Sequence, residues 1–149
     1  MARPISAGSS KEGINMSDPV REYLREKGCA QHVIRGGLDG LIGAWEKTVE
    51  SVERGYELGL DDYLNDLDGR QLIEETLEID GVENAQKNLE RVRRVDERMR
   101  NRVRLTGYCL WGNAAATRHG WSADKNWWYF SVPKTAGPEL LIDLNSDRR

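Results

Sequence analysis

The hydrophobic pattern is most regular between Leu38 and Leu58, where it predicts a long amphipathic helix. Seven apolar residues recur there at steps of three and four: Leu38, Leu41, Ile42, Trp45, Val49, Val52 and Tyr56. This spacing places them on one helical face and leaves the charged residues on the other. Such a helix is about 30 Å long, enough to span a small domain. We therefore expect the rest of the chain to pack against it, with Trp45 near the centre of the core.

Three further segments have helical patterns. Residues 17–19 (SDP) supply a cap and a first-turn proline for a helix that ends near Gly28. From 60 to 79, the apolar positions predict either two short helices or one bent helix. A second long helix is expected from 82 to about 105.

The last third of the chain is rich in tryptophan and has a β-like pattern. Residues 127–132 alternate in character and predict a strand, and residues 140–144 would supply its antiparallel partner. Alternation places Trp127 and Trp128 on opposite faces of this strand. We expect Trp128 to be buried and Trp127 to be the more exposed of the two.

These elements predict a mainly α fold, a three- or four-helix bundle with a short C-terminal β-hairpin packed on it. A chain of 149 residues fits a single domain. Residues 1–15 are small or polar and predict a disordered tail, so Met16 is a candidate start of the folded protein. The folded domain is expected at 16–149, with its Trp-rich β segment at about 106–145.

The composition favours a reducing, cytoplasmic location without membrane contact. No apolar run approaches the ~20 residues of a membrane helix, and the N-terminal segment lacks the apolar core of a secretory signal. Two cysteines, Cys29 and Cys109, are too few for a disulfide framework. With His32 and His119 they are candidate zinc ligands, but their spacing is not that of structural zinc sites.

The net charge of -3 is unevenly distributed. An acidic middle, 46–83, precedes a basic helix that carries five cations at helical spacing: Lys87, Arg91, Arg94, Arg98 and Arg102. The first interpretation is that this face pairs with the acidic middle or is solvated. A binding face for an acidic protein comes second, and nucleic acid third. Trp127 is a further candidate contact, with a partner protein or a second copy of the chain.

Two pairs of glutamates, Glu50 with Glu53 and Glu75 with Glu78, have the spacing E-x-x-E on neighbouring predicted helices. Such carboxylates can hold Mg²⁺ against a phosphate chain. The pairs resemble the metal motif of all-α nucleotide pyrophosphohydrolases, although that family's second motif ends in Asp where this chain has Glu78. The resemblance implies a Mg²⁺-dependent enzyme acting on a phosphorylated small molecule. The other interpretation is an acidic, solvated surface without a cofactor.

Asp96 interrupts an apolar stripe, since it falls between Val92 and Met99 on the same helical face. An unpaired carboxylate there is costly, so Asp96 should meet Arg93, Arg100, a tryptophan N–H or a helix terminus. We expect a polar contact in the core rather than a functional site.

The sequence therefore predicts a non-catalytic interaction or accessory module. The alternative is the Mg²⁺-dependent enzyme, and a nucleic-acid-binding protein is the third hypothesis.

Overall fold

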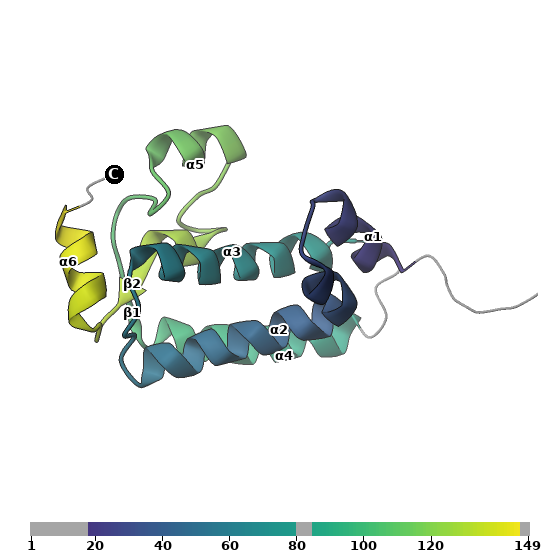
Figure 1. Ribbon diagram of the computed structural model, residues 1–149, viewed down its shortest axis with the longest axis horizontal. Helices are drawn as coiled ribbons and strands as arrows, with labels where there is room; N and C mark the ends of the chain where they lie inside the picture. Colours follow the sequence, from purple (N-terminus) through teal and green to yellow (C-terminus); the bar gives the residue numbers. More distant parts are fainter. Residues whose placement is uncertain (1–17, 80–84, 147–149) are drawn as a thin grey trace, which may run out of the picture.

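The computed structural model describes residues 18–79 and 85–146, and these form a mainly helical bundle with a short antiparallel sheet (Figure 1). This confirms the predicted fold class. The predicted tail at 1–15 and the candidate start at Met16 lie outside the described residues. The elements, in order, are α1 (Pro19–Glu26), α2 (Gln31–Glu53), α3 (Leu60–Leu77), α4 (Ala85–Arg100), β1 (Val103–Leu105), α5 (Asn113–His119), the 3₁₀ helix η2 (Trp127–Phe130), β2 (Ser131–Pro133) and α6 (Pro138–Ser146).

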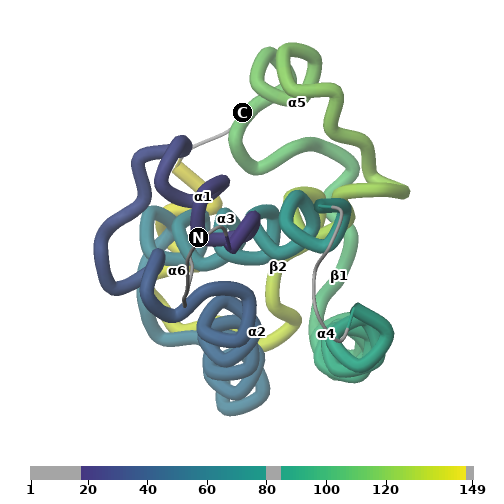
Figure 2. The backbone as a smooth tube through the Cα atoms, turned by 90° about the vertical axis from the view of Figure 1, so that its right-hand side faces the viewer, coloured from purple at the N-terminus to yellow at the C-terminus, as the bar shows by residue number. Residues whose placement is uncertain are grey.

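Three helices, α2, α3 and α4, form the body of the molecule. Seen along the bundle, α2 and α4 lie on one side of α3, and α5 lies on its other side (Figure 2). The short helix α1 covers one end of the bundle, and α6 covers the opposite end (Figure 1). One flank of α3 therefore faces the core, while the other faces α5 and the segment that follows it.

The apolar stripe of the organising helix is buried as predicted, from Leu38 to Tyr56, with Trp45 only 1% exposed. The helix itself ends earlier than expected, at Glu53, because Gly55 adopts a φ of +95° that reverses the chain. Tyr56 remains buried beyond the helix end. The region 60–77 is a single helix, α3.

The predicted strand pairing is wrong. Residues 127–130 form a 3₁₀ turn, and only Ser131–Pro133 is extended, paired with Val103–Leu105 at the end of the α4 segment. Residues 140–144, the expected partner strand, lie within helix α6. Short apolar runs fit a helix or a strand equally well, and here Pro138 starts a helix whose Leu140 is buried.

The expected exposure of Trp127 is also wrong. A 3₁₀ turn does not place successive side chains on opposite faces. Both rings are buried, Trp128 at 1% and Trp127 at 5% exposed, and the Arg100 guanidinium lies 4.3 Å from the centre of the Trp127 ring. Trp127 therefore supports the core rather than offering a surface contact.

Candidate functional site

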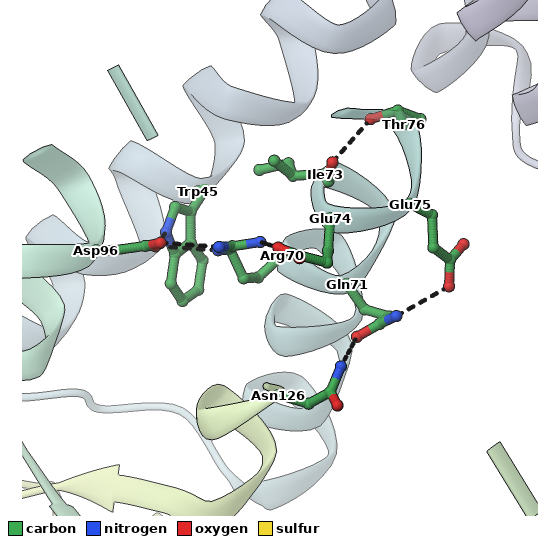
Figure 3. Close-up of polar contacts among 9 residues, drawn as sticks. All are labelled: Trp45, Arg70, Gln71, Ile73, Glu74, Glu75, Thr76, Asp96 and Asn126. Atoms are coloured by element: carbon green, nitrogen blue, oxygen red, sulfur yellow. Dashed lines mark hydrogen bonds and ion pairs between the residues drawn. The ribbon is translucent and has the colours of Figure 1, made fainter. Parts of the chain in front are cut away.

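Helix α3 separates two polar clusters. On one flank Arg70 points to Trp45 and Asp96, and on the other Gln71 lies between Asn126 and Glu75 and bonds to both (Figure 3). The first cluster is buried in the bundle, and the second lines an open groove. The adjacent residues Arg70 and Gln71 of α3 thus lie in the buried cluster and in the groove, respectively.

The core cluster is centred on the Asp96 carboxylate. Trp45 Nε1 donates to Asp96 Oδ1 at 2.9 Å, so a tryptophan N–H is one of its partners, as its place in the stripe predicted. Arg70 donates through Nε and Nη2 to both carboxylate oxygens, at 3.0 and 2.8 Å. The Arg70 guanidinium also lies 4.1 Å from the centre of the Trp128 ring. The polar groups of Trp45, Arg70 and Asp96 all bond within the fold, so we regard this cluster as structural. The buried Trp128 Nε1 has no hydrogen-bond partner among the described residues.

Arg70 was missed as a core residue by the sequence interpretation. It falls three residues after Leu67 and three before Ile73, within the apolar stripe of α3, and it is 5% exposed. That is the same signal that identified Asp96, a charge on an apolar helical face.

The groove lies between the C-terminal half of α3 and residues 119–129, and its volume is about 660 Å³. α3 contributes the polar wall, which includes Asp68, Gln71, Glu74, Glu75 and Glu78. The opposite wall includes His119, Trp121, Lys125, Asn126 and Tyr129, and Lys27 and Cys29 close the end next to α1.

A stack of three rings builds the aromatic wall. Trp121 lies 4.5 Å from His119 and 4.2 Å from Tyr129, at interplanar angles of 19° and 28°. Two rings so close to one indole and so nearly parallel to it must occupy its opposite faces. Gly120, at a φ of +71°, ends α5 and turns the chain so that His119 and Trp121 can meet.

Asp68 anchors this wall to α3. It accepts hydrogen bonds from the Tyr129 hydroxyl at 2.6 Å and from Trp111 Nε1 at 3.0 Å. Burial, together with the bond to Asp68, raises the pKa of Tyr129, so its hydroxyl remains a donor at neutral pH. The innermost ring of the stack is therefore fixed in position.

Glu75 is similarly fixed. It accepts from the Tyr23 hydroxyl at 2.6 Å and from Gln71 at 3.0 Å, and it pairs with Lys27 at 3.3 Å. Burial acts to raise the pKa of Glu75, but these hydrogen bonds and the lysine charge outweigh it and hold the pKa below its ordinary value. Burial and the bond to Glu75 raise the pKa of Tyr23 to about 12. Gln71 also accepts from Asn126, which ties the two walls together.

The groove is acidic. Its lining includes four carboxylates and two lysines, a formal charge of -2 with His119 neutral. Glu74 accepts from Arg70 through Oε1, and Glu78, at the C-cap of α3, is exposed. Glu74 and Glu75 lie in the last turn of α3, which holds no basic residue. Acidic side chains at the negative end of a helix dipole are unfavourable.

The predicted basic face of α4 is largely engaged with α2. Arg91 pairs with Asp39 and Glu46, and Arg98 holds both carboxylate oxygens of Glu53, at 3.0 and 2.8 Å.

Arg102 donates to the Glu53 carbonyl, while Lys87 and Arg94 are exposed. The hydrogen bond from Arg98 lowers the pKa of Glu53. These contacts agree with the interpretation that pairs this face with the acidic middle.

The two E-x-x-E pairs lie at opposite ends of the bundle. Glu53 faces α4 near the C-terminus of α2, whereas Glu75 contacts α1 at the other end (Figure 1). Glu50 and Glu78 are exposed. Within residues 18–79 and 85–146, no three His, Cys, Asp or Glu side chains gather as a metal site. The fold thus does not bring the four glutamates into the single site that the family resemblance implies.

No protein-family model matches this chain, and comparison with curated proteins and with solved structures gave no match either. None of the helices in the described part of the chain combines the length and hydrophobicity needed to cross a membrane. We therefore take the function from the chemistry of the groove.

Proposed function

We propose that this protein is a non-catalytic binding module that holds a segment of a partner protein in the groove between α3 and residues 119–129. One observation carries the proposal: the groove joins an aromatic wall to an acidic wall, and internal hydrogen bonds fix both in place. A wall that is ordered before binding loses little entropy when a partner docks. The low cysteine content favours the cytoplasm as its location.

The ionisable groups of the groove support binding rather than catalysis. Asp68 and Glu75 each accept two or more hydrogen bonds, and these bonds hold the carboxylates in place. The raised pKa values of Tyr23 and Tyr129 keep both hydroxyls protonated at neutral pH, so they serve as donors and not as bases.

Charge favours a protein partner over a nucleic acid. An acidic groove repels phosphates, and nucleic-acid binding relies on basic residues that neutralise them. Of the five cations of the predicted basic face, Arg91 and Arg98 on α4 and Arg102 just after it already bond to α2.

A native pull-down with matched variants tests the proposal. His119→Ala removes the outer ring of the stack, and Glu78→Lys reverses the charge at the groove mouth. Glu50→Lys is the control, because it makes the same charge change at an exposed site on α2.

We expect the wild-type protein and Glu50→Lys to recover the same set of partner proteins. For both groove variants the recovery of these partners should fall by about tenfold, as for interface hot spots. Equal recovery by all four proteins, or recovery no higher than that of empty beads, would contradict the proposal.

A further inference from the structure

The core shows how this protein surrounds a guanidinium group. Arg70 stacks on the Trp128 ring at 4.1 Å and holds both oxygens of Asp96 with two of its nitrogens. A flat cation satisfies both contacts at once, since its face meets the ring and its N–H groups point outward to the carboxylate. An aromatic face beside a carboxylate is therefore the environment that an arginine side chain prefers.

The groove presents the same two kinds of group on facing walls. His119 and Trp121 form the exposed end of the ring stack, and Glu74 and Glu78 lie across from them on α3. These two glutamates are four residues apart, so they project from the same face of the helix. Arg70 already pairs with Glu74 through Oε1 at 3.1 Å, whereas Glu78 forms no ion pair within the described residues. An added cation would therefore be attracted mainly to Glu78 and to the second oxygen of Glu74.

The end of α3 adds to this attraction. Its last carbonyl groups carry the negative end of the helix dipole, and the last turn holds acidic residues without a base. Lys27 pairs with Glu75 and Arg70 pairs with Glu74, while Lys125 is the opposing charge on the far wall. The lining as a whole remains acidic.

We infer that the groove receives the guanidinium group of an arginine in the partner segment, held between the His119–Trp121 stack and the carboxylates of Glu74 and Glu78. The inference rests on the proposed function, because it names the partner chemistry of the same groove. Arginine fits better than lysine, since a planar group can stack on a ring and reach two carboxylates, whereas an ammonium is a compact point charge. A metal ion fits less well, because no three His, Cys, Asp or Glu side chains gather as a metal site among the described residues.

Isothermal titration calorimetry with capped Gly/Ser peptides tests the inference. One peptide carries a central arginine, a second carries citrulline, which has the same shape without the charge, and a third carries lysine. We expect the arginine peptide to bind about tenfold or more tightly than the citrulline peptide, and several-fold more tightly than the lysine peptide. Spermidine, a small polyamine, should bind more weakly than the arginine peptide.

Glu78→Lys should weaken arginine-peptide binding by about tenfold or more, whereas Glu50→Lys should leave it within about twofold at the same ionic strength. Glu78→Lys should not lower the melting temperature, because a lysine at a helix C-terminus complements the dipole. A loss of binding in this variant therefore reports on recognition and not on unfolding.

Equal binding of the citrulline peptide, an equal effect of Glu50→Lys, or tighter binding of spermidine would overturn the inference. Its failure is distinguishable from that of the proposed function. If no arginine peptide binds but the pull-down still yields proteins that depend on His119, the arginine assignment is wrong and the binding module stands. If the pull-down also yields no groove-dependent protein, both are wrong.

Discussion

Trp45 of α2 and Asp96 of α4 meet in the middle of the bundle, where the indole N–H donates to a carboxylate oxygen at 2.9 Å (Figure 3). The same carboxylate holds the Arg70 guanidinium of α3 with both oxygens. One largely buried anion therefore contacts all three helices of the bundle. Because Arg70 also stacks on Trp128, the cluster fixes the 3₁₀ turn to the core as well.

We expect Asp96→Asn to destabilise the protein by up to about 3–5 kcal/mol, because it leaves the buried Arg70 charge with only the partly exposed Glu74 as a counter-ion. Urea denaturation measures the loss. The double variant Asp96→Leu/Arg70→Met removes both charges and should lose less than the sum of its two single variants. Additive losses would show that the two residues do not form a coupled pair.

Tyr23→Phe should reduce stability at neutral pH by about 1 kcal/mol, since it removes the hydroxyl that donates to Glu75. The folded-state pKa of Glu75 is lowered, so its contribution is present above the unfolded pKa, about 4.3, and is lost as the pH falls through the folded value. The difference from wild type should therefore be smaller at a pH below the folded-state pKa of Glu75 than at pH 7. Denaturation at both pH values measures it, and an equal loss at both would contradict the assignment.

Asp66→Asn should raise the melting temperature at pH 7. Burial raises the pKa of Asp66, although the hydrogen bond from Tyr56 acts in the opposite direction. The ionised carboxylate thus costs stability above its folded-state pKa, and protonation relieves the cost as the pH falls. An asparagine oxygen still accepts from Tyr56, and the gain should disappear below about pH 4. A lower melting temperature at pH 7 would mean that the charge stabilises the fold.

Gly37→Ala should destabilise the protein by about 1–2 kcal/mol, because Gly37 adopts a φ of +61° at a kink in α2. Arg21 donates to the carbonyls of Ile34 and Arg35 near this kink, at 3.1 and 2.7 Å. Gly36→Ala is the matched control, since an added methyl group there meets open space in a helical turn. It should be neutral or stabilising. Similar effects of both changes in thermal melts would show that the kink does not require glycine.

The sequence predicted those parts of the fold that depend on helical periodicity. The buried stripe through Trp45 and the bundle of long helices follow from residue spacing alone. The structure of the C-terminal third could not be predicted from residue spacing. Strand β2 pairs with residues about thirty positions earlier, and η2 is too short to show a period. Local patterns carry no information about such distant pairing.

The groove could not be predicted from the sequence either. Tyr129 and Asp68, which join its walls, are 61 residues apart, and Gln71 and Asn126 are 55 apart. His119 was a candidate zinc ligand in the sequence, and its stacking on Trp121 depends on the turn at Gly120. The acidic residues of the last turn of α3 could be recognised in the sequence, but only the fold places the rings of the aromatic wall opposite them.

Chemical-shift mapping with the arginine peptide tests the central claim most directly. In ¹H–¹⁵N spectra we expect the indole N–H of Trp121 and the backbone amides of 71–78 and 119–129 to move together as the peptide is added. The amides of α4 and α6 should remain in place and serve as internal controls. Shifts centred on α4 or α6, or no shifts at millimolar peptide, would contradict the assignment of the groove as the binding site.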